Sequence, residues 1–182
     1  MQRLLEKYKK TAAPVLQKDF GIANIMAIPK IKKVVINTGI GKFLKDDKAI
    51  ERVKRDISLL SGQKAVMKKA KQSIAGFKTR EGMEVGIAVT LRGKRMYDFI
   101  DRLISVALPR SRDFRGIEPK NFDKMGNLNL GIKESSIFPE VNYENIKDIF
   151  SLEVTVVTDA KNREKGTALL KLLGFPIKSS LR

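Results

Sequence analysis

Short β-branched runs alternate with amphipathic helical stretches along this chain, and this alternation most restricts the folds open to it. Val34, Val35 and Ile36 belong to a run that predicts a strand over 31–38. Apolar residues recur three or four positions apart over 94–108, which predicts a helix. The order is not a regular βαβ repeat. It therefore favours an α+β fold with one sheet, helices packed mainly on one face and the other face free.

The same two patterns predict the remaining elements. Helices are expected over 3–19, 46–60, 94–108 and 162–173, and strands over 31–38, 64–69, 85–91 and 152–157. Pro14 should kink or restart the first helix, and Pro109 should end the third. The segment 71–84 has no clean period and indicates a mobile loop or an extended hairpin, while 122–133 predicts a small hairpin.

Length and composition limit the classes of protein further. The chain has 182 residues, of which 42% are hydrophobic, enough for a core within a single domain over 1–182. It contains no Cys, no His and no Trp. Cys or His zinc sites, disulfides, a catalytic cysteine and a Ser-His-Asp triad are therefore excluded. An enzyme would have to use Asp, Glu, Lys, Ser or Tyr alone.

The charge is large and unevenly placed. The formal net charge is +17, and residues 1–62 and 63–120 each contribute +8, whereas residues 121–182 contribute only +1. Between Ile57 and Arg80 there is no acidic residue at all. Such a chain repels itself, which indicates an anionic partner: nucleic acid, an anionic membrane or an acidic protein. The alternative is a lysine-rich exposed face with no target.

Targeting and membrane signals are weak. No segment offers 18 consecutive apolar residues, so no transmembrane helix is expected. The first 16 residues have no apolar core of a secretory signal, and their mixed charges do not suit a mitochondrial transit peptide. We expect a soluble cytoplasmic protein.

Three local motifs could carry chemistry. The run Gly39–Lys42 follows a strand but lacks the spacing of a Walker or dinucleotide loop, so a tight turn is the better interpretation. Asp98 and Asp101 lie three residues apart on a predicted helix, a spacing that could let both carboxylates bind one metal ion. The nearby Arg95 and Arg102 favour ordinary ion pairs on the helix surface instead. Asp46 stands where a helix N-cap is expected.

A fourth motif, Pro109–Gly116, places Arg110, Arg112 and Arg115 around Phe114. Arginine suits phosphate contacts, and an exposed Phe can stack on a base. Alternatively, the segment is an ordinary charged loop and Phe114 is buried in the protein core. Aromatic residues are scarce, so RNA binding would depend more on shape, phosphates and polar side chains than on a stacking surface.

An ordered set of motifs resembles one known family over nearly the whole chain. The motifs cover Val34–Gly41, Ser61–Gln63, Lys69–Lys78, Arg80–Met83, Val89–Gly93, Pro109–Gly116, Gly131–Glu134, Phe138–Glu140 and Leu169–Gly174. Together they resemble the bacterial-type large-subunit ribosomal protein number five, the family that binds 5S ribosomal RNA. Thr38 stands where many members have Met, Ala65 where Pro is common and Ser111 where an aliphatic residue is usual.

The resemblance implies a fold, a place and partners. The fold is a mainly antiparallel sheet with helices on one face and an RNA-facing surface on the other. The place is the central protuberance of the large ribosomal subunit, in the cytoplasm. The partners are 5S rRNA, the P-site tRNA, other 5S-binding large-subunit proteins and a small-subunit head protein across the intersubunit bridge. We expect no enzyme activity, no cofactor, no metal and no membrane, and a monomer off the ribosome.

The resemblance also assigns residues. Asn37, Gln63 and Thr90 match the family's 5S-binding polar positions, and such side chains suit ribose hydroxyls and base edges. Turn and cap chemistry is the alternative role, especially for Gln63. The cations expected to neutralise rRNA phosphates are Lys64, Lys68 and Arg92.

The basic segment 71–84 resembles the family's tRNA-contacting loop, with Lys71, Lys78 and Arg80 as contacts. Arg110, Arg112 and Arg115 are expected to make phosphate or bridge contacts, and the bridge region is expected within 122–143. Two other classes remain open: a metal-dependent RNA-processing enzyme using Asp98 or Asp101, and a peripheral membrane protein using its N-terminal helix.

Overall fold

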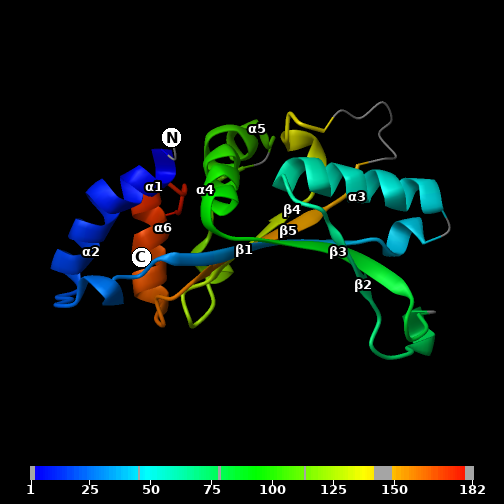
Figure 1. The fold of residues 1–182 in the computed structure, drawn as a ribbon, viewed down its shortest axis with the longest axis horizontal. Helices are drawn as coiled ribbons and strands as arrows, with labels where there is room; N and C mark the ends of the chain where they lie inside the picture. Colours follow the sequence, from blue (N-terminus) through cyan, green and yellow to red (C-terminus); the bar gives the residue numbers. More distant parts are fainter. Residues whose placement is uncertain (1–2, 45, 78, 113, 142–148, 179–182) are drawn as a thin grey trace. The chain divides into compact units, whose positions relative to one another are not determined.

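A computed structural model of the protein describes residues 3–44, 46–77, 79–112, 114–141 and 149–178 (Figure 1). The chain forms two compact units, each built from separate stretches. Unit 1 consists of Met1–Val34, Leu91–Leu130 and Thr155–Arg182, and unit 2 consists of Val35–Thr90 and Gly131–Val154. A single domain over 1–182 therefore stays a prediction.

The strands form one five-stranded antiparallel sheet in the order β2-β3-β1-β5-β4. Their bounds are Ile31–Gly39 (β1), Val66–Lys69 (β2), Glu84–Leu91 (β3), Leu128–Ile132 (β4) and Leu152–Thr158 (β5). The α-helices are Arg3–Lys7 (α1), Ala13–Asp19 (α2), Asp47–Ser61 (α3), Gly93–Arg102 (α4), Leu108–Arg110 (α5) and Arg163–Leu173 (α6). The predicted α+β class is confirmed.

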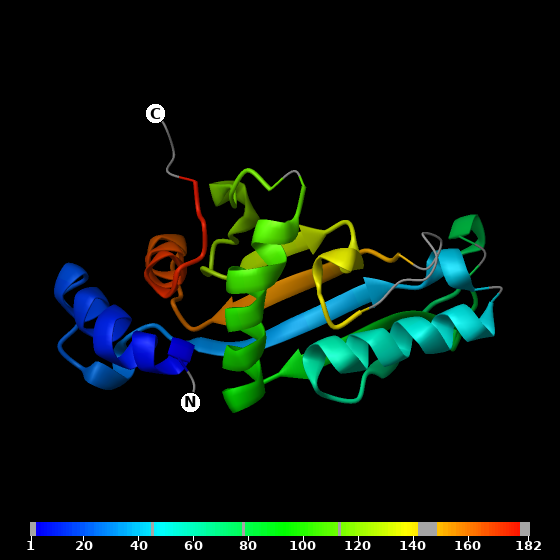
Figure 2. The ribbon, with the colours of Figure 1, turned by 90° about the horizontal axis from the view of Figure 1, so that it is seen from above.

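In unit 2, helix α3 lies along one side of strands β1 and β3 (Figures 1 and 2). Val53, Ile57 and Leu60 of its apolar stripe are buried, and Ile50 at its start is half-buried. Strands alternate their side chains between the two faces of a sheet. Ile36 of β1 and Ile87 of β3 are buried, whereas Asn37 is exposed. One sheet face of this unit therefore contributes to the core with α3, and the opposite face carries the exposed Asn37.

Both ends of α3 are determined by local residues. The Asp46 side chain caps the helix, because its Oδ1 accepts a hydrogen bond from the Ala49 backbone N–H at 3.1 Å. Gly62 follows the helix with φ of +64°, a left-handed conformation that glycine adopts without steric strain. The predicted N-cap is confirmed.

Replacing Asp46 by alanine should destabilise the protein by about 1 kcal/mol, because the Ala49 N–H loses its acceptor. The measurement is the free energy of unfolding from urea denaturation. Asp47→Ala is the matched control, since Asp47 lies one residue later, in the first turn, and should cost only a few tenths of a kcal/mol. Equal losses in the two variants would contradict the capping role.

In unit 1, each of two prolines follows a π-helical turn. Tyr8–Ala12 is such a turn before Pro14, and Leu103–Ala107 before Pro109. In a π-helical turn each N–H bonds to the carbonyl five residues earlier instead of four. Accordingly, the Leu108 N–H donates to the Leu103 carbonyl. The helix thus accommodates a residue without an N–H and continues to Arg110. The prediction that Pro109 ends this helix is wrong for that reason.

The N-terminal helical segment of unit 1 packs beside α6 (Figure 2). The Lys7 Nζ donates to the Leu173 carbonyl at 3.0 Å, at the end of α6.

The predicted hairpin over 122–133 is present only in part. Phe122 and Leu128 form an isolated bridge, and β4 is the edge strand beside β5.

Candidate nucleic-acid interface

The sheet face of unit 2 opposite α3, here called the open face, carries a row of residues across three neighbouring strands. Lys68 of β2 pairs directly with Gly86 of β3, so both lie on the same face. Asn37 of β1 comes next. A Cβ atom placed on Gly86 would lie 4.0 Å from the Asn37 Oδ1. The row therefore joins an exposed cation and an exposed amide, with the buried Gly86 between them.

Small residues keep this face flat. Gly86, Ala88 and Thr90 alternate along β3 with the buried Ile87 and Val89, so all three lie on the open face. A Cβ on Gly86 would meet the Thr38 carbonyl oxygen at 3.1 Å, closer than an ordinary contact. Gly86 thus leaves no side chain between Lys68 and Asn37, and the exposed Val66, which pairs with Ala88, lies on the same face.

Two of the predicted RNA-binding residues are in direct contact. The Gln63 Nε2 donates to the Thr90 carbonyl oxygen at 3.3 Å. Asn37 lies farther along the face, because Gly86 and Thr90 are four residues apart, about 13 Å along a strand. The three polar positions thus share unit 2, and Gln63 also has the structural role that was the alternative to RNA contact.

Serine hydroxyls connect the end of α3 to the segment that carries Gln63 and Lys64. The Ser58 hydroxyl accepts from the Ala65 N–H at 3.1 Å and donates to the Lys54 carbonyl. The Ser61 hydroxyl donates to the Gln63 carbonyl oxygen at 2.9 Å. These bonds hold the polar segment beside the open face.

A shallow hollow of about 460 Å³ lies beside Asn37, at the end of β1. Its lining combines glycine backbone, polar and charged side chains and the apolar Ile132 and Leu152. The residues are Asn37, Thr38, Gly39, Gly131, Ile132, Lys133, Ser151, Leu152 and Glu153. Beneath it, the buried Thr38 hydroxyl donates to the Ser151 carbonyl at 2.6 Å, which connects β1 to the start of β5.

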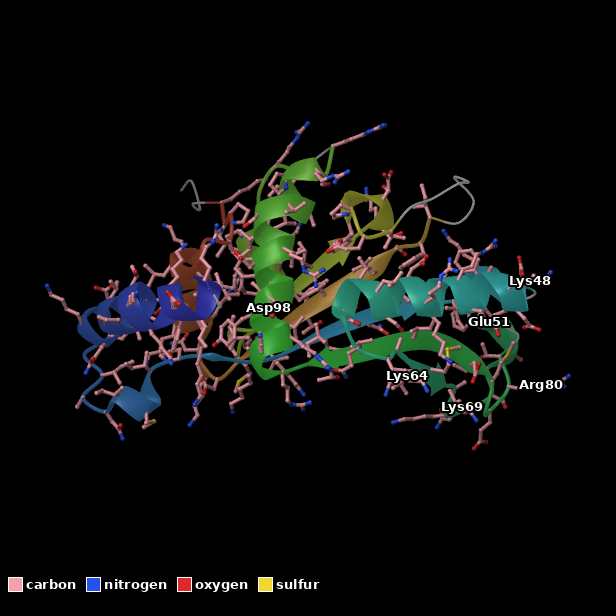
Figure 3. The ribbon with its side chains drawn as sticks, turned by 45° about the horizontal axis from the view of Figure 1, so that its top comes forward. Lys48, Glu51, Lys64, Lys69, Arg80 and Asp98 are labelled. Atoms are coloured by element: carbon pink, nitrogen blue, oxygen red, sulfur yellow. The ribbon has the colours of Figure 1, made fainter. Side chains whose placement is uncertain are left out.

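Cations line β2 and the hairpin that follows it. This basic edge comprises Lys64, Lys68, Lys69, Lys71 and Arg80, all of which are exposed. In Figure 3, Lys64, Lys69 and Arg80 lie on the side of the strands away from α3, whose Lys48 and Glu51 lie above them. In the described part of the chain, none of the four lysines pairs with an acid, so their charge stays available to an anion.

The described residues of the segment 70–83 extend the β2–β3 hairpin, one of the two forms predicted for it. Ala70 N–H donates to the Met83 carbonyl at 2.8 Å, and Gly82 N–H to the Ala70 carbonyl at 3.0 Å. Farther out, Ile74 and Thr79 form an antiparallel bridge around the short turn Ala75–Phe77. Lys78, one of the predicted tRNA contacts, lies outside the described residues.

The remaining predicted cations belong to unit 1. Arg92 is exposed and precedes α4, Arg110 ends α5, and Arg112 and Arg115 are exposed in the following loop. Phe114 is half-buried, which is intermediate between the two predicted roles. In the predicted bridge region, Ile137 and Phe138 are buried, and residues 142 and 143 lie outside the described part of the chain.

The alternative sites gain no support from the geometry. Asp101 Oδ1 lies 3.4 Å from the Arg3 guanidinium, so this carboxylate forms a surface ion pair with a cation of the N-terminal helix. The described residues hold no group of three or more acids suited to a metal ion. The 39–42 segment leads into a short 3₁₀ turn, Gly41–Phe43, rather than a phosphate-binding helix. Within the described ranges, no helix has the length and apolarity needed to cross a membrane.

Sequence reasoning missed Gly86, the centre of the open face. An isolated glycine inside a predicted strand is a known signal for close backbone approach or a bulge. The signal was present at 86, but its meaning depends on which strands flank β3.

Comparison with known proteins agrees with this geometry. Residues 24–80 match the family model described as ribosomal protein L5, and residues 84–177 match the ribosomal L5P family C-terminus. The large ribosomal subunit protein uL5 of Syntrophomonas wolfei is 53% identical over 178 residues, covering 98% of this chain and all of the relative. The uL5 proteins of Geotalea daltonii and Thermoanaerobacter sp. are 52% and 51% identical over 98% and 97% of this chain, and cover 100% and 98% of those relatives.

These matches define the class first: RNA-binding, non-enzymatic proteins of the large ribosomal subunit. Within that class, the chain belongs to the L5 family, called uL5 in the bacterial relatives. The resemblance drawn from the motifs is confirmed. In bacteria the large subunit is cytoplasmic, as the sequence predicted for this chain.

Proposed function

We propose that this ribosomal protein binds 5S rRNA through the open face of unit 2 and helps attach it in the central protuberance. The row of Lys68, Gly86 and Asn37 carries the proposal. It places an exposed cation and an exposed hydrogen-bonding amide on either side of a strand position that has no side chain. A-form RNA presents a wide, shallow minor groove with 2′-hydroxyls, which the exposed Lys68 and Asn37 can contact together.

Affinity and discrimination come from different residues in this proposal. Lys64 and Lys68, with Arg92, neutralise phosphates and orient the RNA. Asn37 and Thr90 bond ribose hydroxyls and base edges. Gln63 keeps its side-chain oxygen as an acceptor while its amide N–H holds the Thr90 carbonyl.

Further contacts follow from the family resemblance. We propose that Lys71, Lys78 and Arg80 of the hairpin contact the P-site tRNA. Arg110, Arg112 and Arg115, or the 122–143 region, contact RNA phosphates or a small-subunit head protein at the bridge. Other 5S-binding proteins of the large subunit are expected as neighbours. The ordered hairpin and its exposed cations support the first of these proposals.

The test replaces Asn37, Gln63 and Thr90 together by alanine and measures binding to 5S rRNA, to tRNA and to a duplex RNA. Each lost hydrogen bond should weaken 5S binding by about 1 kcal/mol, so the triple variant should bind roughly 100-fold more weakly. Binding to the duplex control should change little, because its phosphate contacts remain. Unchanged 5S affinity and selectivity would contradict the residue assignment.

Salt dependence separates specific from general binding. If about six to ten phosphates are contacted, wild-type affinity should fall by roughly 10³–10⁵ between 50 and 200 mM salt. A preference for 5S rRNA that survives at the higher salt supports the proposed site. Equal binding to all three RNAs, lost together with salt, would leave only a basic protein.

A further inference from the structure

Phe77 stands at the outer end of the hairpin and is 77% exposed. Among the aromatic residues that the structure describes, the other rings are buried or half-buried. Ile74, across the same turn, is 48% exposed. Leaving a phenylalanine ring in water forfeits the free energy of burying it, and here the exposed ring stands together with the exposed Ile74 at one turn.

The turn that presents Phe77 is ordered by its own hydrogen bonds. Phe77 N–H donates to the Ile74 carbonyl at 3.2 Å, and Ile74 N–H donates to the Thr79 carbonyl at 3.0 Å. Below the turn, the Ser73 hydroxyl accepts from the Glu81 N–H at 2.9 Å. Because the turn is closed before any partner binds, less conformational entropy is lost when the ring is covered.

The surroundings of the ring favour nucleic acid as the partner. The small residues Ala75 and Gly76 precede Phe77, and a Cβ on Gly76 would have no neighbour within 4 Å, so these two residues add little bulk beside the exposed ring. Lys69, Lys71 and Arg80 supply cations on both strands leading to the turn. A membrane or a protein partner would be expected to need a wider apolar patch than one ring and one isoleucine.

We propose that Phe77 stacks on an accessible base of the RNA that the hairpin contacts, while the flanking cations hold the adjacent phosphates. The inference rests on the proposed RNA-binding function and adds a stacking contact to it. A stacked base has a π-face whatever its identity, so the contact tolerates sequence and detects an exposed base rather than a particular one. Either tRNA or 5S rRNA could supply that base.

The absence of tryptophan makes the stacking directly measurable. Phe77→Trp introduces a single indole at the turn, and stacking of a base on it should quench its fluorescence. The full-length variant is titrated separately with tRNA, 5S rRNA and a blunt duplex RNA at low salt. Met26→Trp is the matched control, because Met26 is 81% exposed and belongs to unit 1. Saturable quenching is expected for Phe77→Trp with tRNA or 5S rRNA, and the RNA that quenches identifies the source of the base.

Affinity gives an independent measure. Phe77→Ala should weaken binding of the quenching RNA by about 5- to 150-fold, the range for loss of one stacked base. Phe77→Tyr keeps the ring and should retain the affinity. Met26→Ala should have no effect.

The outcomes separate the two proposals. If the wild-type protein binds 5S rRNA but Phe77→Trp is not quenched by any RNA and Phe77→Ala binds as tightly as wild type, the stacking proposal is overturned and the 5S function stands. Equal quenching of Met26→Trp, or a blue shift of Phe77→Trp with anionic phospholipid vesicles in place of RNA, also overturns it. If the wild-type protein binds no RNA, both proposals fall.

Discussion

Glutamine in place of the four lysines of the basic edge should lower the affinity for 5S rRNA by about 10³ at roughly 0.1 M salt. The variant changes Lys64, Lys68, Lys69 and Lys71, which are exposed and pair with no acid in the described part of the chain. Each lysine that contacts a phosphate releases a counterion on binding. Each lysine replaced therefore makes the slope of log affinity against log salt concentration shallower by about 0.9, the value for one phosphate contact on a duplex.

The measurement is the 5S dissociation constant at several salt concentrations between 50 and 200 mM. The slope should become shallower by about three to four, with the preference for 5S rRNA partly retained because Asn37, Gln63 and Thr90 are unchanged. A matched control neutralises four exposed lysines outside the basic edge: Lys9, Lys18, Lys124 and Lys171. If the control loses as much affinity as the basic-edge variant, net charge rather than this surface determines binding.

Gly166→Ala should destabilise the protein by about 3 kcal/mol, although alanine normally stabilises a helix by about 1 kcal/mol relative to glycine. Gly166 lies in α6 and packs directly on the backbone of Gly126. A Cβ at 166 would lie 2.6 Å from the Gly126 Cα and 2.8 Å from its carbonyl carbon. Real Cβ atoms do not approach backbone so closely, so one of the two segments must move.

Hydrogen bonds prevent the turn that contains Gly126 from moving freely. The Thr158 hydroxyl donates to the Gly126 carbonyl at 3.0 Å, and the Thr158 N–H donates to the Asn127 Oδ1 at 2.9 Å. The Asp123 carboxylate accepts from the Asn127 backbone N–H at 2.8 Å. Displacing the turn would break some of these bonds in a largely buried place, which adds to the steric cost.

Thermal unfolding measures the effect, and a loss of about 3 kcal/mol corresponds to a Tm lower by about 6–12 °C for a chain of this size. Ala168→Gly is the control for helix propensity. Ala168 is half-exposed in the same helix and should lose about 1 kcal/mol. Gly76→Ala, with open space around its Cβ position, should be nearly neutral. A Gly166→Ala protein more stable than wild type would contradict the close packing.

Local signals predicted the elements of this fold well. The helix over 46–60 was predicted because its cap residue, its apolar stripe and its closing glycine are all local, and Asp46 and Gly62 act as expected. The end of the 94–108 helix was predicted wrongly, because the π-helical turn before Pro109 shifts the hydrogen-bond pattern. Nothing in the run of apolar residues there marks that shift.

The candidate site was predicted in composition but not in arrangement. An acid-free basic stretch is visible between Ile57 and Arg80, and the family motifs identify Asn37, Gln63 and Thr90. Val35 and Ile36 are both apolar, so the sequence does not say which face of β1 stays open. That depends on α3 covering the other face, a contact between distant parts of the chain.

By itself, then, the sequence determined the α+β class, the local helix ends, the family and the placement of positive charge in the first two thirds of the chain. These properties depend on residues close together in the chain or on overall composition. Only the tertiary structure decided that Lys68, Gly86 and Asn37 form one row, that Gly166 must be glycine and that Phe77 is exposed on an ordered turn. Each of these depends on strand order, register or packing, which are set by contacts between residues far apart in the sequence.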